Sequence, residues 1–246
     1  MRKITLIVGT FLILFGATQV SSAPRMTMGE SAFNFGYVPQ NSKISHDFWL
    51  FSTGDDSLKI LKVIPGWGCT KAPLSKKELA VGDSTRLEII FSTKTYKNRI
   101  TKRPKIQTNE GPPDKRVQII ATVVARPDST YPLLMKPYKL DLSQFGEKLR
   151  DKIDFTIENV SDEKIDLSII SFAHEYFDVN LPSSIDPGKK ASCSLKLKKE
   201  AHKQNFEKSF TIETSDADKS RFTIPVKRQV RNSTHANAKN NAKAGK

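Results

Sequence analysis

The chain has 246 residues, with 40 Lys and Arg against 26 Asp and Glu, and a formal net charge of +14. Its apolar content of 37% is that of an ordinary globular protein and excludes a chain too polar to bury a core. The charge is uneven, because residues 1–23 and 227–246 carry Lys and Arg but no acid. The remaining residues are only moderately basic.

The amino terminus predicts export. Arg2 and Lys3 precede an apolar run at residues 4–17, and small and polar residues follow up to Ala23. The run is too short to span a bilayer comfortably. We expect cleavage after Ala23 or after Ser22, with an uncleaved anchor as the alternative. The mature protein is then periplasmic or secreted and has no transmembrane segment.

Short strands are predicted along the whole chain. Runs rich in branched and aromatic residues alternate with turn clusters, and no segment shows a long helical period with caps. The predicted strands are residues 33–35, 46–51, 86–91, 117–121, 138–142, 154–158, 192–197, 209–212 and 221–226. Strands of this length and spacing predict an all-β protein built from antiparallel sandwiches.

The second half of the chain weakly repeats the first. Residues 47–60 match residues 154–167 without a gap. A repeat of this length predicts two copies of one strand-rich unit. We therefore expect two tandem antiparallel β-sandwiches after a cleaved signal peptide. The expected boundaries are 1–23 for the signal peptide, 24–125 and 138–230 for the sandwiches, 126–137 for a Pro-rich linker and 231–246 for a disordered basic tail.

The first half resembles a known bacterial family. It opens with Phe33–Val38 (FNFGYV), continues with an aromatic strand ending in Ser52–Gly54, and reaches Gly68-Cys69-Thr70 before a further turn and strand. In this order and spacing, residues 30–125 resemble the Domain of Unknown Function 1573 family. The resemblance implies an exported immunoglobulin-like module, similar in fold to the major sperm protein and to chaperone-type domains of pilus assembly. It implies a fold and a location rather than an activity.

The two cysteines are expected to stay unpaired. Cys193 alternates with apolar residues of a predicted strand, so it should lie in the core of the second sandwich, whereas Cys69 should lie in a loop of the first. The family usually shows Cys-Gly-Cys-Thr where this chain has Trp67-Gly68-Cys69-Thr70. A thiol redox or metal protein that uses Cys69 is therefore kept as a third alternative.

Motifs of catalysis and metal binding are missing from the sequence. The four histidines do not have a zinc-ligand spacing, and neither a nucleophile elbow nor a phosphate-binding glycine loop occurs. We therefore predict a protein that is not an enzyme, with no catalytic residues, no metal ligands and no cofactor.

An aromatic strand is the first candidate for binding. Phe48 and Leu50 alternate with Trp49 and Phe51, and neighbouring strand residues point to opposite faces. If the first pair faces the core, Trp49 and Phe51 face outward and offer an aromatic surface to a partner protein. The alternative is that they pack under a loop or against the second sandwich.

Trp67 and Cys69 are further candidates for protein interaction. They lie in a glycine-containing loop, where glycines allow close backbone approach. The loop is either a recognition loop or one in which Trp67 covers the open end of the sandwich.

A basic segment is the other candidate. Residues 94–105 are predicted as a hairpin without acids, with the cations Lys94, Lys97, Arg99, Lys102, Arg103 and Lys105. The hairpin either holds an anionic envelope glycan or lipid surface or is solvated, with lysines that discourage edge pairing. Nucleic acid is not expected, because Tyr96 alone offers no stacking platform.

Taken together, these features predict an exported, non-enzymatic structural or protein-interaction module of the bacterial envelope. An envelope protein of unknown identity would bind through a sheet edge or the aromatic face. The alternative is a binder of anionic glycan or lipid that uses residues 94–105.

Overall fold

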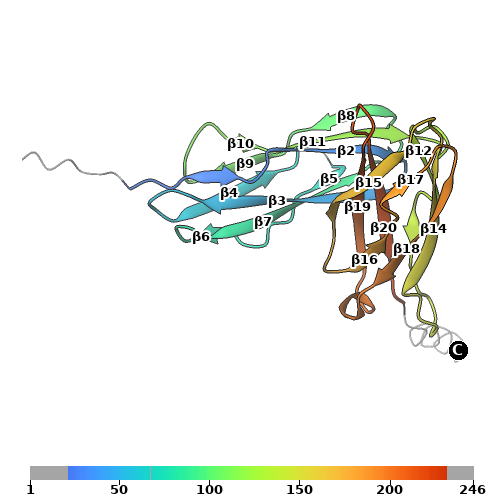
Figure 1. The fold of residues 1–246 in the computed structure, drawn as a ribbon. Helices are drawn as coiled ribbons and strands as arrows, with labels where there is room; N and C mark the ends of the chain where they lie inside the picture. The colour runs from blue at the N-terminus through green and yellow to red at the C-terminus, as the bar shows by residue number, and fades with distance from the viewer. Residues whose placement is uncertain (1–21, 67, 232–246) are drawn as a thin grey trace, which may run out of the picture.

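The computed structural model describes residues 22–66 and 68–231. The described chain forms two arms that meet at an elbow (Figure 1). The first arm contains β1 (Met26–Met28), β2 (Ala32–Pro39), β3 (Lys43–Ser52), β4 (Leu58–Ile64), β5 (Thr70–Lys71), β6 (Glu78–Leu79), β7 (Ser84–Ser92), β8 (Asn98–Lys102), β9 (Lys105–Thr108), β10 (Lys115–Arg116) and β11 (Gln118–Val124). The second contains β12 (Leu133–Lys136), β13 (Leu140–Asp141), β14 (Lys152–Asn159), β15 (Ile165–Phe172), β16 (Phe177–Asn180), β17 (Ser184–Ile185), β18 (Lys190–Leu197), the 3₁₀ turn η1 (Lys199–Ala201), β19 (Phe206–Thr214) and β20 (Arg221–Arg228).

The first arm is a sandwich of two layers. One layer is the sheet β1-β3-β7-β5, in which β3 and β7 pair from Lys43↔Ser92 to Phe51↔Ser84. The other layer combines β2, β11 and β8 with the sheet β10-β9-β4-β6, and only residues 103–104 separate β8 from β9. Both layers alternate buried and outward side chains, as a sheet with one face on a core requires.

The second arm repeats this arrangement of strands. The sheet β12-β14-β18-β16 faces a layer formed by β17, β15, β19 and β20. The pairing of β14 with β18 corresponds to that of β3 with β7, and β15 with β19 corresponds to β4 with β9. β3 and β4 contain residues of the segment 47–60, and β14 and β15 contain residues of the matching segment 154–167. That the two halves are copies of one unit stays a prediction. The expected all-β fold is confirmed.

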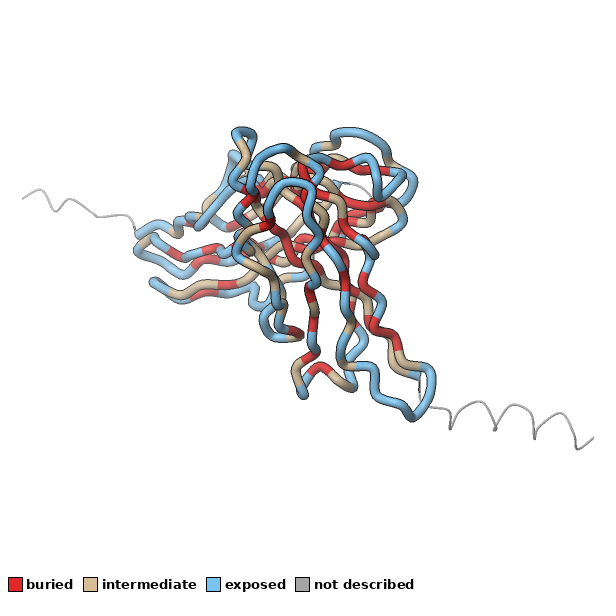
Figure 2. Tube along the Cα trace, turned by 45° about the vertical axis from the view of Figure 1, so that its right-hand side comes forward, coloured by how far each residue is buried: buried red, intermediate tan, exposed pale blue. Residues whose placement is uncertain are grey.

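The buried apolar side chains form two clusters, one in each arm. Buried positions occur along the strands of both arms (Figure 2). The first cluster runs from Met26 to Val123 and the second from Val124 to Val226. Aromatic rings occupy both cores, among them Phe48 and Phe91 in the first and Phe210 in the second. Each arm therefore buries an apolar core of its own.

The elbow is made by strands of both arms. β2 pairs in parallel with β20 at Tyr37↔Phe222, so that one sheet runs from β17 through β20 and β2 to β8. The Thr223 hydroxyl donates to the Phe35 carbonyl at 2.6 Å. This pairing joins the two sandwiches through backbone as well as side chains.

Gly36 allows the close approach at the elbow. Its φ is +64°, and a Cβ at this position would lie 2.0 Å from the Arg221 carbonyl oxygen. Glycine lacks the Cβ that disfavours positive φ, and no side chain is tolerated at that distance. The FNFGYV motif therefore has a structural role, because its glycine brings β2 next to β20.

One segment of the expected architecture differs in the structure. The expected linker, residues 126–137, contains β12, which pairs with β14 and buries Leu133 and Met135. This strand was missed because it is short and lies between two prolines, Pro132 and Pro137. Most strand pairs are antiparallel, as expected, and β2–β11, β2–β20 and β13–β20 are parallel pairs. Parallel neighbours require long connections, which the intervening strands provide.

The two ends of the chain fall largely outside the described residues. This applies to the expected signal peptide up to residue 21, and to the expected basic tail from residue 232. Across residues 22–66 and 68–231, no helix has the length and apolar character needed to cross a membrane.

Candidate functional site

A groove of about 710 Å³ lies at the elbow between the two arms. One wall is the outward face of β3 and β7, and the other consists of β15, the turn after it and part of β19. Trp49 and Arg86 belong to the first wall, and Ile170, Phe172 and Glu175 belong to the second. The groove therefore needs both arms to exist.

The first wall follows from the alternation of β3. Ile44, Phe48 and Leu50 point into the core, so the alternate residues Ser45, Asp47, Trp49 and Phe51 point to the other face. β19 covers the start of this outward face, where the Ser45 amide donates to Ser209 Oγ at 3.0 Å and Ser209 Oγ donates to the Ser45 carbonyl at 3.1 Å. Further along β3 none of the described strands lies over the face, and Trp49 remains 48% exposed.

The two aromatic residues predicted on this face thus point outward. Phe51 is also exposed, although it does not line the groove. The second arm covers part of the β3 face but leaves Trp49 and Phe51 uncovered, because it meets β3 at Ser45. Their use as a binding surface stays a prediction.

The second wall was missed by the sequence analysis. β15 has a bulge between Ile169 and Ser171, and the exposed side chains beside it are Ile170 and Phe172, the latter 41% exposed. The consecutive pair Ile169-Ile170 breaks the alternation expected of a strand with one solvated face. That break is the signal in the sequence from which a bulge could have been inferred.

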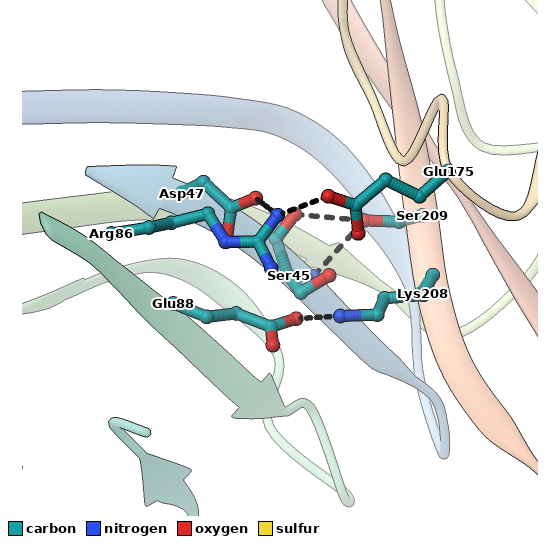
Figure 3. Close-up of polar contacts among 7 residues, drawn as sticks. All are labelled: Ser45, Asp47, Arg86, Glu88, Glu175, Lys208 and Ser209. Atoms are coloured by element: carbon teal, nitrogen blue, oxygen red, sulfur yellow. Dashed lines mark hydrogen bonds and ion pairs between the residues drawn. The ribbon is translucent and has the colours of Figure 1, made fainter. Parts of the chain in front are cut away.

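Ion pairs cross the groove and hold its walls together (Figure 3). Arg86 Nη1 lies 2.9 Å from Glu175 Oε1 and 3.5 Å from Asp47 Oδ2. Beside it, Lys208 Nζ donates to Glu88 Oε1 at 2.6 Å, and both side chains are largely buried. Burial raises the pKa of Asp47, and the Arg86 guanidinium opposes this rise. These five charged side chains of the groove are therefore paired with one another.

His46 links the arms at the inner end of the groove. Its ring stacks on Phe33 with centroids 3.6 Å apart, and Nδ1 lies 3.0 Å from Ser171 Oγ of the second arm. Nε2 contacts the Glu30 carboxylate. Burial lowers the pKa of His46, and Glu30 opposes this effect.

Cys69 lies away from the groove. Its thiol is unpaired and buried, and Sγ is 3.5 Å from Tyr96 Oη. Trp67, the neighbouring candidate, falls outside the described residues. Cys193 is also an unpaired thiol and lies in the core of the second arm, as expected. Within residues 22–66 and 68–231 no cluster of three or more His, Cys, Asp or Glu side chains is arranged to hold a metal.

The predicted basic hairpin was wrong. Residues 94–105 do not fold back on themselves, because β8 pairs with β11 and β9 pairs with β4 and β10. The segment has no turn in its middle, where Pro104 only separates two strands of the same direction.

The cations of this segment are consequently spread along the arm. Lys94, Lys97, Arg99 and Arg103 are exposed, and Lys105 is half-buried. Lys102 is buried, with its ammonium 5.0 Å from the Tyr96 ring centroid. Arg103 Nε donates to Gln118 Oε1 at 2.8 Å. The structure therefore does not gather the six cations in one patch.

Several known proteins are similar to this chain. A Porphyromonas gingivalis W83 protein of unknown function has 12% identity, with 83% of this chain and 99% of that one covered and a TM-score of 0.36. WR4, a major sperm protein family member of C. elegans, has 15% identity over 41% of this chain and 98% of its own, with a TM-score of 0.30. The PapD-like domain 7 of human CEP192 has 9% identity over 50% and 99%, with a TM-score of 0.35.

No curated protein matches the chain. The model of the family described as Protein of unknown function (DUF1573) matches residues 26–123. These are the residues whose buried side chains form the core of the first arm. The family model therefore matches the first arm, which confirms the resemblance seen in its sequence.

Proposed function

We propose that this protein is an exported, non-enzymatic interaction module of the bacterial envelope, and that it holds a partner protein in the groove at the elbow. The observation that supports this most is the pair of exposed aromatic side chains, Trp49 and Phe172, on opposite walls of one groove. Large aromatic residues in a concave site are typical centres of protein interfaces.

The charges of the groove favour an uncharged partner surface. Arg86 is paired with Asp47 and Glu175, and Lys208 with Glu88. A charged partner would have to separate these pairs, whereas an apolar or neutral segment leaves them intact. The elbow also fixes the two walls before binding, and a preformed site loses less entropy when it is occupied.

A sheet edge is available beside the aromatic walls. Among the described strands, β15 pairs on its outer side only with β17, at Ile165 and Asp166. At the other end of β15, residues 169–172 line the groove. An extended segment of the partner would add to this edge through main-chain hydrogen bonds while its side chains contact Trp49.

The test is photocrosslinking in the native envelope. A benzoylphenylalanine at position 49 should capture a specific protein, and the same residue at position 61 should not. Leu61 is a suitable control because it is even more exposed than Trp49 and does not line the groove. The captured protein is then purified, and its affinity for the wild type and for the Trp49→Ser, Phe172→Ser variant is measured.

We expect the variant to lose at least about tenfold in affinity, as for truncation of central interface residues. Raised salt should change the affinity little, because an aromatic interface is not screened. Equal capture at positions 49 and 61 would contradict the proposal. So would material that elutes with salt and is retained by the variant, which would instead favour an anionic partner on the exposed cations of residues 94–105.

A further inference from the structure

The far end of the second arm has an apolar tip. In the loop between β13 and β14, Phe145 is 59% exposed and Leu149 is 46% exposed. Neither side chain belongs to a core cluster or lines the groove. The two residues are close in sequence, so a large aromatic and a large aliphatic side chain share one exposed loop.

The loop is firmly held at its base. Arg228 is 1% exposed, and its Nη1 donates to the carbonyls of Leu142 at 2.8 Å and Arg150 at 2.9 Å. The Gln144 backbone N–H donates to the Gln229 backbone carbonyl at 2.8 Å, and the Arg231 backbone N–H donates to the Gln144 backbone carbonyl at 3.0 Å. Phe145 and Leu149 are therefore exposed on an anchored loop, whose entropy of ordering is already lost before any contact forms.

Basic residues outnumber acidic residues around this tip. Arg228 Nε also donates to the His202 carbonyl at 3.1 Å, which places the turn around η1 beside the loop. The Arg231 guanidinium lies 5.6 Å from the Phe145 ring centroid. In residues 143–151, 199–205 and 229–231, the exposed or half-buried bases are Lys148, Arg150, Lys199, Lys203 and Arg231, and the acids are Glu147, Asp151 and Glu200.

The chain beyond Arg231 adds to this charge. Residues 232–246 contain Lys239, Lys243 and Lys246 and no acid. Their only apolar side chains are alanines, which are too small to cover Phe145 and Leu149. The sequence outside the described residues thus supplies positive charge to this end of the arm but no apolar partner for its tip.

We propose that this end of the second arm docks on an anionic lipid surface. Phe145 and Leu149 enter the boundary between headgroups and acyl chains, and the surrounding Lys and Arg side chains lie against headgroup phosphates. Combined apolar and basic contacts are what bind a protein to such a surface. A soluble anionic polymer would attract the charges but leave the apolar tip in water. A second copy of the chain would bring two basic ends together.

The proposal is independent of the groove and is tested on vesicles. The protein is recovered after export and its N-terminus is determined by mass spectrometry, so that residues 4–17 do not contribute. Co-sedimentation is measured with vesicles of phosphatidylcholine and with vesicles of equal parts phosphatidylcholine and phosphatidylglycerol. The variant is Phe145→Ser, Leu149→Ser, and the matched control is Val81→Ser, which removes an equally exposed apolar side chain from the first arm.

We expect the wild type and the Val81→Ser control to bind the anionic vesicles at least about tenfold more tightly than the neutral ones. The Phe145→Ser, Leu149→Ser variant should lose about tenfold on anionic vesicles, with an unchanged circular dichroism spectrum. Equal binding to both kinds of vesicle would overturn the proposal. Full binding by this variant would also overturn it, since the contact would then depend on charge alone. A dimer that dissociates only in the variant would assign the tip to a second copy.

Discussion

Replacing Gly36 by alanine should open the elbow. Gly36 has a φ of +64°, and the added Cβ would meet the backbone of Arg221, 2.0 Å from its oxygen and 2.4 Å from its carbon. A backbone atom cannot rotate away as a side chain does, so β2 and β20 must separate. The hydrogen bond from Thr223 to the Phe35 carbonyl and that from Arg221 to the Asn34 carbonyl would be lost with the pairing.

The magnitude follows from two contributions. An alanine at positive φ costs about 1–2 kcal/mol, and each hydrogen bond contributes about 1 kcal/mol. Gly36→Ala should therefore lower the free energy of unfolding by about 3–4 kcal/mol. Gly188→Ala is the matched control, because Gly188 has a φ of +65° but nothing lies within 4 Å of an added Cβ. The control should lose only about 1–2 kcal/mol.

The assay is urea denaturation followed by circular dichroism, with small-angle X-ray scattering of the native variants. Gly36→Ala should unfold at lower urea and show a larger radius of gyration than the wild type. Gly188→Ala should keep the wild-type radius. Equal losses of stability in the two variants, with equal radii, would refute the view that close backbone contact at Gly36 holds the arms together.

Three further predictions concern buried ionisable groups. Lys208→Met leaves the Glu88 carboxylate without its partner and should lower the free energy of unfolding by about 2 kcal/mol, as measured by thermal denaturation. The Glu88→Gln, Lys208→Met double variant should recover part of this stability. Burial lowers the pKa of His46 from its ordinary 6.5, so the unfolded chain binds the proton more tightly and stability is lost as the pH falls below 6.5. His46→Gln should flatten this fall in the melting temperature, and a parallel pH profile would contradict the assignment. Burial raises the pKa of the Cys193 thiol to about 11, so iodoacetamide at about pH 8 should modify Cys193 only after unfolding, as followed by mass spectrometry; native modification at the unfolded rate would contradict it.

The sequence predicted correctly those features that depend on local patterns of residues. The alternation around Phe48 and Trp49 placed one in the core and the other outside, because side-chain direction in a strand depends only on sequence spacing. The all-β fold followed from the same short-range signals. Cys193 was placed in the core on this basis as well.

Contacts between distant segments could not be predicted in this way. The sequence analysis interpreted Gly36 as part of a family motif. In the structure, glycine is required there because the backbone of Arg221, in the other sandwich, leaves no room for a Cβ. The groove requires both arms, so no single strand revealed it, and its second wall depends on the bulge at Ile170. The prediction of a hairpin at residues 94–105 was wrong because a run of cations does not indicate which strand it pairs with.

The pairing of β2 with β20 also determines when, during synthesis, the chain can finish folding. Thr223 and the Phe35 carbonyl that it contacts are 188 residues apart in the chain. A chain made from its amino terminus presents β2 early, while β20 is the last of the described strands to emerge. The first sandwich has its own core and can fold at once, but one side of β2 must wait unpaired until β20 emerges. A chain truncated before Arg221 should therefore keep a folded first arm with a permanently open β2 edge.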